Sequence, residues 1–435
     1  MTRKIRMTSP QSPGQTVLPP RLALLPYLAK WLLLASAVAV LAGTASAFFL
    51  FALEWATATR IAHRWFIWGL PVAGFLVGWV YLHLGQQVEA GNNLLIDEIH
   101  DPKKVIPLRM APLIFSATVL SHLFGASVGR EGTAVQMGGA LADQLTRVFK
   151  LRHADRRIIL MAGISAGFAS VFGTPLAGAI FGLEVLAIGR LRYDALLPCI
   201  VAAVVADQLG MLWGVHHTMY VIGAIPAISV WGFCAMVIAG GIFGLTGKAF
   251  AGATHSLSAW MKKQVRYAPL RPLLGGLLIA VIAGFFAVER YLGLGIPVIV
   301  EAFQHPLPSY DFAAKMALTV LSLGSGFKGG EVTPLFYIGA TLGNALAPLL
   351  QMPFALLAGV GFVAVFAGAA NTPIASTLMA IELFGAEIGV YAAIACVVSY
   401  LFSGHTGIYR SQRIGHAKRS DAPVGVKLDE LPDVH

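Results

Sequence analysis

The stretch that decides the fold is Gly129-Arg130-Glu131-Gly132-Thr133, where a carboxylate and a guanidinium stand beside glycines at the start of an apolar run. Charged side chains are rare at membrane depth and usually serve transport or binding there. Two hundred residues later, Gly329-Gly330-Glu331-Val332-Thr333 keeps the Gly-x-Glu-x-Thr spacing and again opens an apolar run. The repeated pattern predicts a chain built from two related halves.

Composition places the chain in a membrane. Of 435 residues, 57% are hydrophobic and 12% are charged, against roughly 45–50% and about 25% in an average soluble domain. Apolar windows long enough to cross a bilayer occur at Leu22–Leu53, Trp65–Leu84, Ala195–Val215, Val230–Ala251 and Leu270–Val288. Shorter apolar segments, broken by Gly or Pro, include Thr133–Leu145, Ile158–Phe172, Leu176–Ala187, Pro334–Leu350, Phe354–Ala370 and Ile374–Phe384. We therefore expect an all-α polytopic membrane protein with many tilted and broken helices.

A second pair of landmarks supports the duplication. Thr174-Pro175 and Thr372-Pro373 lie 198 residues apart, an offset close to that of the two glutamate motifs. We divide the chain into a cytoplasmic tail at 1–21, a first membrane half at 22–215, a second half at 216–403 and a C-terminal segment at 404–435. Residues 420–435 are polar and expected to be loose. Related halves in transporters commonly pack as an inverted pair around a central site.

The Thr-Pro pairs also have an ordinary structural explanation, since a helix often begins with a Thr cap followed by Pro. We expect Thr174 and Thr372 to be such caps. Glu184 and Glu382 end the apolar runs that follow. Helix-end anchors satisfied by local donors are favoured for both, with a proton-relay role as the alternative.

Basic residues set the expected orientation. Residues 1–21 carry Arg and Lys but no acidic residue, and the segments Arg147–Arg157, Lys262–Arg271 and Arg410–Arg419 are basic too. The positive-inside rule puts both termini in the cytoplasm. Ala45-Ser46-Ala47 imitates a cleavage site, but the apolar run continues to Leu53, so a retained helix is expected. The net charge of +10 needs no nucleic-acid partner, because this asymmetry and anionic lipid explain it.

The sequence indicates no cofactor and no metal. Cys199, Cys234 and Cys396 are isolated thiols without CxxC spacing, and the histidines form no ligand pattern. A membrane enzyme that uses Glu131 and a histidine would belong to a different class of protein. It is disfavoured because the chain has no His-Glu-x-x-His motif.

Three glycine-rich turns offer seats for an anion: Gly91-Asn92-Asn93, Gly129–Thr133 and Gly329–Thr333. The N-terminus of a helix exposes unpaired N–H groups and the positive end of its dipole. Glycine allows close approach, while the side chains of Asn92, Thr133 and Thr333 add hydrogen-bond donors. Each turn is therefore able to bind an anion without a full positive charge.

Glu131 brings a carboxylate into this setting, where it can occupy an anion position itself. Once protonated it is neutral and can leave, which gives a physical basis for coupling anion and proton movement. The alternative is that Glu131 only pairs with Arg130 or caps its helix. Arg130 is expected to tie the loop through carbonyls or a carboxylate. Glu331 is expected to be either a second titrating group or a partner of Lys328.

These motifs resemble the CLC chloride channels and proton-coupled transporters. The resemblance rests on Gly129–Gly132, the Gly-x-Glu-Val-Thr-Pro turn, the Thr-Pro repeats and Gly404-His405-Thr406-Gly407-Ile408-Tyr409, and it covers Leu22 to Arg413. It implies a homodimer with one pathway in each protomer, built from inverted halves. It also implies that Glu131 is the gating glutamate, and that the anion pathway is formed by Asn92, Gly129, Arg130, Gly132, Thr133, Glu331, Val332, Thr333 and Tyr409.

Departures from the chloride pattern resemble the bacterial fluoride/proton antiporter subgroup. Asn92 stands where chloride members have the ion-coordinating serine, Thr133 replaces a proline, and Val185 falls at the inner proton glutamate. Fluoride is small and strongly hydrated, so its desolvation must be offset by several hard donors. We expect an exporter of fluoride in exchange for protons in the bacterial inner membrane. The alternative is a chloride or nitrate exchanger or an anion channel.

Overall fold

The computed structural model describes residues 24–418 and 423–431. This part of the chain contains sixteen α-helices, two short strands and six short 3-10 helices. The α-helices are α1 (Leu24–Ala62), α2 (Leu70–Leu84), α3 (Asn92–His100), α4 (Met110–Phe124), α5 (Glu131–Val148), α6 (His153–Phe172), α7 (Pro175–Glu184), α8 (Leu196–Leu212), α9 (Val230–Gln264), α10 (Leu270–Phe285), α11 (Ile296–Glu301), α12 (Asp311–Ser325), α13 (Val332–Leu350), α14 (Phe354–Ala370), α15 (Pro373–Phe384) and α16 (Gly389–Phe402). The other elements are η1 (Arg64–Gly69), η2 (Gln86–Val88), η3 (Tyr193–Ala195), η4 (Glu289–Tyr291), η5 (Ala386–Ile388), η6 (Leu428–Glu430), β1 (Ala187–Ile188) and β2 (Arg413–Ile414).

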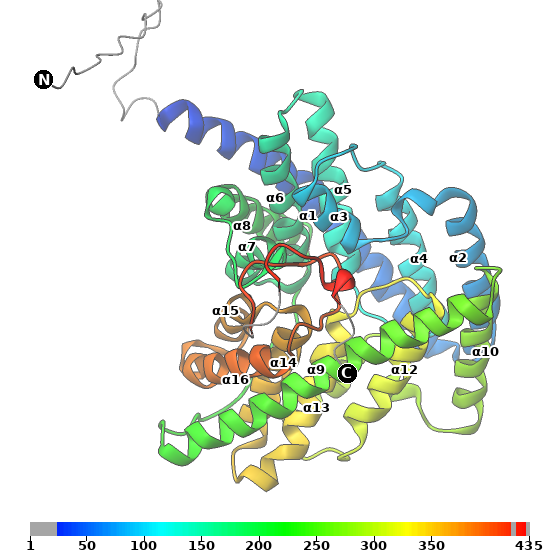
Figure 1. Cartoon of the computed structure of the whole chain (residues 1–435). Coiled ribbons are helices and arrows are strands. Elements are labelled where there is room, and N and C mark those ends of the chain that lie inside the picture. The colour runs from blue at the N-terminus through cyan, green and yellow to red at the C-terminus, as the bar shows by residue number, and fades with distance from the viewer. Residues whose placement is uncertain (1–23, 419–422, 432–435) are drawn as a thin grey trace, which may run out of the picture.

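The helices form one bundle in which the two parts of the chain lie against each other (Figure 1). Helices α1 to α8 occupy the upper part of the view and α9 to α16 the lower part. Helices α5, α6 and α7 have 18, 20 and 10 residues, and α13, α14 and α15 have 19, 17 and 12. A run of two long helices and one short helix thus occurs twice, each time after a glutamate turn.

Five stretches of helix in the described residues have the length and apolar composition to cross a membrane, at Leu24–Ala62, Arg64–Leu84, Tyr193–Leu212, Val230–Gln264 and Val332–Leu350. At 1.5 Å per residue, α1 with its 39 residues is about 58 Å long, so it must tilt or project beyond a bilayer core. Two length predictions were wrong. The window at Leu270–Val288 forms a helix of only 16 residues, while the segment at Pro334–Leu350 belongs to a full-length helix of 19.

Two short sequence patterns that resemble functional motifs, one in α1 and one in α6, lie within regular helices. Helix α1 runs through Ala45–Ala47 and ends at Ala62, so this stretch is the middle of a helix. Gly163-Ile164-Ser165-Ala166-Gly167 has the spacing of a hydrolase nucleophile turn, but it lies within α6. The Ser165 hydroxyl is buried there and donates to the carbonyl of Ala179 at 3.3 Å.

Glycines let the long helices of each repeated run approach closely. A methyl group on Gly138 of α5 would lie 2.3 Å from the carbonyl oxygen of Gly163 on α6. On Gly339 of α13 it would lie 2.0 Å from the carbonyl oxygen of Gly361 on α14. Small residues allow such contacts between membrane helices, which associate through van der Waals packing. The same packing device therefore holds α5 to α6 and α13 to α14.

The C-terminal segment returns across the bundle, seen in red in Figure 1. Strand β2 pairs in parallel with β1, directly after α7. Lys427 Nζ lies 2.7 Å from a carboxylate oxygen of Asp97 on α3, and Arg413 binds Asp101. The hydrogen bond from Arg413 lowers the pKa of Asp101. Residues 425–429 are thus held by backbone hydrogen bonds to residues 410–414 and by the Lys427–Asp97 ion pair, contrary to the prediction of a loose tail. Residues 420–422 and 432–435 of that predicted tail lie outside the described residues. The predicted tail at 1–21 lies outside the described residues.

Candidate anion and proton site

The two glutamate turns meet at the centre of the molecule. The N–H of Gly129 donates to the carbonyl of Gly330 at 2.6 Å, and the N–H of Gly330 donates to the carbonyl of Gly129 at 2.8 Å. Helix α5 begins at Glu131 and α13 begins at Val332, so two helix N-termini converge behind this bridge. The arrangement brings together backbone N–H groups and positive dipole ends from both halves.

The Glu131 carboxylate is fully buried and lies at the N-terminus of α13. One oxygen accepts the N–H of Thr333 at 3.0 Å and the N–H of Arg130 at 3.2 Å. The other accepts the Thr333 hydroxyl at 2.5 Å. Glu131 therefore occupies a seat whose donors come mainly from the other half of the chain, rather than capping its own helix.

Arg130 contacts a carboxylate, one of the two kinds of partner expected for it. Its Nε lies 3.5 Å from a carboxylate oxygen of Glu131 and makes no hydrogen bond within the described part of the chain. The side chain is 19% exposed and lines a pocket beside Glu131. Arg130 therefore supplies positive charge to this pocket while it pairs with Glu131.

A second polar cluster lies at Gly132, where the side chains of Asn92 and Glu331 meet. A methyl group on Gly132 would lie 3.1 Å from the Asn92 amide nitrogen and 3.6 Å from Glu331 Oε2. Glycine at 132 thus leaves room for both polar side chains. Asn92 Oδ1 and Glu331 Oε2 are buried and have no hydrogen-bond partner among residues 24–418 and 423–431. Buried polar atoms without hydrogen-bond partners are uncommon in proteins, so these two set this point apart from the rest of the core.

Lys328 is not the partner of Glu331. Its ammonium group lies 4.2 Å from the centroid of the Tyr81 ring, and the structure shows no ion pair between Lys328 and Glu331 in the residues it describes. The predicted pairing is therefore wrong, because the Lys328 ammonium group lies over the Tyr81 ring instead.

Thr133, Val332 and Tyr409 complete the set of predicted residues. The Thr133 hydroxyl lies 2.7 Å from that of Thr118 on α4, so the hydroxyl already has a protein partner. Val332 is buried at the start of α13. Tyr409 is 3% exposed, packs edge-on to Phe181 and interacts electrostatically with both Glu331 and Glu131. The structure thus gathers these residues around one centre, although it does not give all of them free donors.

The short helices α7 and α15 cap each other. Glu184 accepts the N–H groups of Ile374 and Ala375 at 3.0 and 2.8 Å. Glu382 accepts the N–H groups of Leu176 and Ala177, both at 2.8 Å. These donors come from the other half of the chain, so the expectation of local donors was wrong while the anchoring role holds.

The expected threonine caps are absent from the same two helices. The hydroxyls of Thr174 and Thr372 make no cap and have no partner in the described structure. Carboxylates take their place because an ionised acceptor makes stronger bonds to helix N-termini than a hydroxyl does. Pro175 and Pro373 do begin their helices, as predicted.

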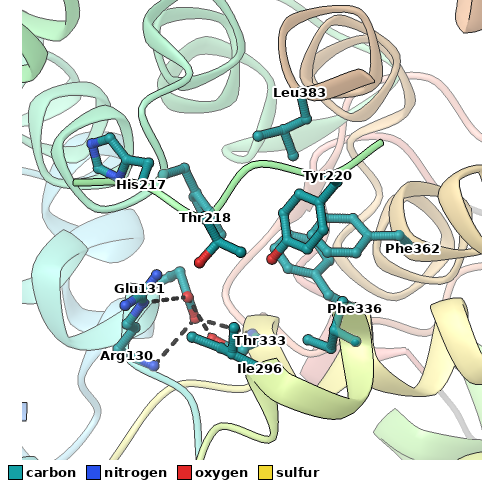
Figure 2. A pocket seen from close by; sticks show the side chains of 12 residues that line it. Arg130, Glu131, His217, Thr218, Tyr220, Ile296, Thr333, Phe336, Phe362 and Leu383 are labelled. Atoms are coloured by element: carbon teal, nitrogen blue, oxygen red, sulfur yellow. Dashed lines mark hydrogen bonds and ion pairs between the residues drawn. The ribbon is translucent and has the colours of Figure 1, made fainter. Parts of the chain in front are cut away.

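Two cavities flank the central site. A small one, of about 20 Å³, lies against Arg130, Glu131 and Thr333 and is closed by His217, Thr218 and Tyr220 (Figure 2). These last three residues were not predicted, since they belong to the polar stretch between the halves that carries no motif.

The second cavity measures about 690 Å³. Its lining includes Lys262, Arg271, Glu89 and Lys328. Glu89 lies three residues before Asn92, and Lys328 lies three residues before Glu331. The larger cavity therefore adjoins the chain segments that lead into two of the three anion turns.

An all-α membrane bundle whose paired helix N-termini enclose a buried carboxylate defines a channel or transporter for ions. Residues 73–404 match the family described as voltage gated chloride channel. A chloride/fluoride channel protein of Pseudomonas syringae pv. tomato is 65% identical over 424 residues, which cover 96% of this chain and 94% of that protein. The protein belongs to the voltage-gated chloride channel family, known as CLC, which is a family of channels and transporters rather than of enzymes.

Solved structures agree with this assignment. A CLC-type fluoride/proton antiporter superimposes with a TM-score of 0.87 at 36% identity, covering 89% of this chain and 98% of that one. A slow cyanobacterial chloride/proton antiporter superimposes with a TM-score of 0.75 at 20% identity, over 86% of this chain and 94% of that one. The second likeness shows the shared fold alone.

Proposed function

We propose that this protein exports fluoride in exchange for protons, and that Glu131 alternately occupies the anion seat and binds a proton. The observation that carries the proposal is the buried Glu131 carboxylate held by the N–H and hydroxyl of Thr333. An anion is thus already bound in a seat made of hydrogen-bond donors, and that anion is a titratable side chain. The named functions of the 65% identical relative and the 36% identical structure support fluoride as the substrate.

Exchange follows from competition for this seat. While Glu131 is ionised, it satisfies the donors of Thr333 and excludes other anions. Protonation removes its charge, and a neutral carboxyl is a much weaker ligand for the N-terminus of α13. Fluoride then takes the seat while the carboxyl carries the proton. Each turnover moves fluoride outward and a proton inward.

Glu331 and Asn92 provide the next station for the proton. The amide nitrogen of Asn92 and Oε2 of Glu331 both lie close to Gly132, and Glu331 Oε2 makes no hydrogen bond in the described residues. A proton on Glu331 would remove the cost of burying its negative charge. Glu331 then serves as the second titrating group, in a chain where Val185 stands at the position of the inner proton glutamate.

Selectivity for fluoride is assigned to the donors around the same centre. Asn92 presents its amide nitrogen toward Gly132, and Thr333 presents an N–H and a hydroxyl from the opposite turn. A small, strongly hydrated ion loses more hydration energy than chloride on entering the protein, so it needs such hard donors. The anion pathway also includes Gly129, Arg130, Thr133, Val332 and Tyr409.

The membrane arrangement follows from the charge pattern and the family. The basic segments around Arg147–Arg157, Lys262–Arg271 and Arg410–Arg419 lie on the cytoplasmic side, together with both termini. The protein is placed in the bacterial inner membrane as a homodimer with one pathway in each protomer. The 690 Å³ cavity, which Lys262 and Arg271 line, then opens toward the cytoplasm.

Reconstitution tests the proposal. Liposomes loaded with fluoride should release it only when the protein is present, and external pH should rise at the same time as protons enter. Fluoride release without a pH change would indicate a channel. Chloride flux equal to fluoride flux would assign the protein to the chloride exchangers instead. Liposomes without protein and a proton ionophore control for leak and for charge build-up.

A further inference from the structure

The link between the two membrane halves, between α8 and α9, covers the outer side of Glu131. Figure 2 shows the hydroxyl groups of Thr218 and Tyr220 directed into the space above Glu131 and Thr333. This space measures about 20 Å³, which is enough for one water-sized particle. Helix α9 separates the link from the basic segment beginning at Lys262, so the link lies on the outer side when that segment is cytoplasmic.

Both ends of the covering segment are fixed by packing. The His217 ring lies against Gly173, where a methyl group would come within 2.5 Å of it, and the backbone there has φ of +69°. Glycine at 173 is thus required both by the turn and by the ring. Tyr220 packs its ring among Phe303, Phe362 and Phe384, with centroids 5.3, 5.5 and 5.9 Å away.

Thr218 therefore lies between two anchored aromatic rings. The next residue, Met219, points away and is 81% exposed. Side chains alternate in this way along an extended segment, so the positions of the Thr218 and Tyr220 hydroxyls are set by the anchors rather than by a flexible loop. Hydroxyls held in advance of binding lose little conformational entropy when an ion arrives.

The chemistry of the space suits a small anion. Thr218 and Tyr220 both line the space and direct their hydroxyl groups into it. Arg130 lines the same space with a guanidinium whose Nε makes no hydrogen bond within the described residues and lies 3.5 Å from Glu131. Fluoride is close to water in size and accepts strong hydrogen bonds from hydroxyl groups, whereas nitrate and chloride are larger.

We propose that Arg130, Thr218 and Tyr220 form an outer fluoride site, which the ion occupies between the Glu131 seat and the external solution. This inference rests on the proposed fluoride/proton exchange and adds Thr218 and Tyr220 as residues that set its affinity. The site fills after Glu131 has been protonated, because an ionised carboxylate in the wall of the space repels a second anion. When Glu131 loses its proton again and fluoride departs, the positive charge of Arg130 offsets this repulsion.

Exchange kinetics test the outer site. Tyr220→Phe and Thr218→Val each remove one hydroxyl, and each should raise the half-saturating fluoride concentration about tenfold, the effect of one hydrogen bond to a charged group. The maximal exchange rate and the fluoride-to-proton ratio should stay close to wild type. Thr218→Ser keeps the hydroxyl and should remain within about twofold of the wild-type half-saturation.

Met219→Leu is the matched control, because it alters the same segment on its outward side and should change nothing. Unchanged half-saturation in both Tyr220→Phe and Thr218→Val would overturn the inference. An equal loss in Thr218→Val and Thr218→Ser would also overturn it, since packing would then matter and the hydroxyl would not. If one variant fails to assemble, the other still decides. Wild-type protein without fluoride/proton exchange would instead reject the proposed function.

Discussion

Two pairs of glutamates related by the repeat have different environments. Glu184 and Glu382 each accept two N–H groups at 2.8 to 3.0 Å from the opposite short helix. The central pair is unequal. Glu131 accepts three hydrogen bonds, whereas Oε2 of Glu331 has no partner in the described residues.

The difference suggests two roles: Glu184 and Glu382 hold the fold together, and Glu131 and Glu331 belong to the candidate site. The matched caps of Glu184 and Glu382 hold α7 and α15 together. At the centre, equal residue types have unequal partners. Thr333 donates to Glu131, while Thr133 contacts Thr118 on α4. The motif is repeated, but its hydrogen bonds are not.

The largest expected effect comes from Glu131→Gln. An amide cannot titrate and cannot compete as an anion for the Thr333 donors, so proton-coupled exchange should fall at least about a hundredfold. Simultaneous fluoride and pH recording in liposomes measures this. Proton uptake driven by a fluoride gradient in this variant would show that exchange does not require the carboxyl group of Glu131.

Glu331→Gln should have the next largest effect. The variant keeps the shape of the side chain but lacks the titratable group, so proton flux should drop about tenfold, less than the roughly hundredfold or more that a group acting directly in proton transfer contributes. Fluoride movement should persist in part and become poorly coupled. Unchanged coupling together with altered thermal stability would mean that Glu331 is structural, like Glu184 and Glu382.

Asn92→Ser tests the donor nearest to Glu331. A hydroxyl offers one donor where the amide offers two, so the preference for fluoride over chloride should fall about tenfold, the worth of one hydrogen bond to an ion. Competing fluoride and chloride fluxes measure it. If selectivity stays the same, Asn92 does not contribute to the choice of anion.

Glu184→Ala and Glu382→Ala should affect stability and leave coupling intact. Glu184→Ala leaves two largely buried N–H groups without an acceptor, which lowers the free energy of unfolding by about 1–3 kcal/mol. The N–H groups that Glu382 accepts are more exposed, so Glu382→Ala should cost less, as measured by thermal unfolding in detergent. Glu387→Ala, at an exposed position, is the control. A change in the fluoride-to-proton ratio would place Glu184 or Glu382 on the proton route.

Arg413→Gln should have the smallest effect, below about 1 kcal/mol, because its partner Asp101 is largely exposed and screened. The hydrogen bond from Arg413 lowers the pKa of Asp101. A depressed carboxylate pKa stabilises the folded state at neutral pH, and this contribution is lost as pH falls through the titration of Asp101. At neutral pH the variant should therefore unfold at a slightly lower temperature than wild type. At acidic pH the two unfolding temperatures should become equal.

Local patterns predicted most of the fold. Apolar windows identified the membrane class, and the spacing of Gly129–Thr133 and Gly329–Thr333 identified the turns that meet at the centre. The partners of these residues were not predictable, because they depend on contacts between distant parts of the chain. Thr333 holds Glu131 across 202 residues, and Glu382 replaces Thr174 as the cap of α7. Thr218 carried no signal because its neighbours in the sequence form no motif.

The paired backbone bonds between Gly129 and Gly330 limit how the molecule can move. Many transporters change access by rocking one half of the fold against the other. Here two backbone hydrogen bonds of 2.6 and 2.8 Å join the halves at the pathway itself. A rocking motion would have to break these bonds, and with them the anion seat, in every cycle. In the proposed exchange, the moving part is then the Glu131 side chain alone, which rotates about its own bonds. Such rotations are intrinsically faster than the microsecond-to-millisecond motions of whole domains, so protonation of Glu131, rather than rearrangement of the halves, would set the pace of turnover.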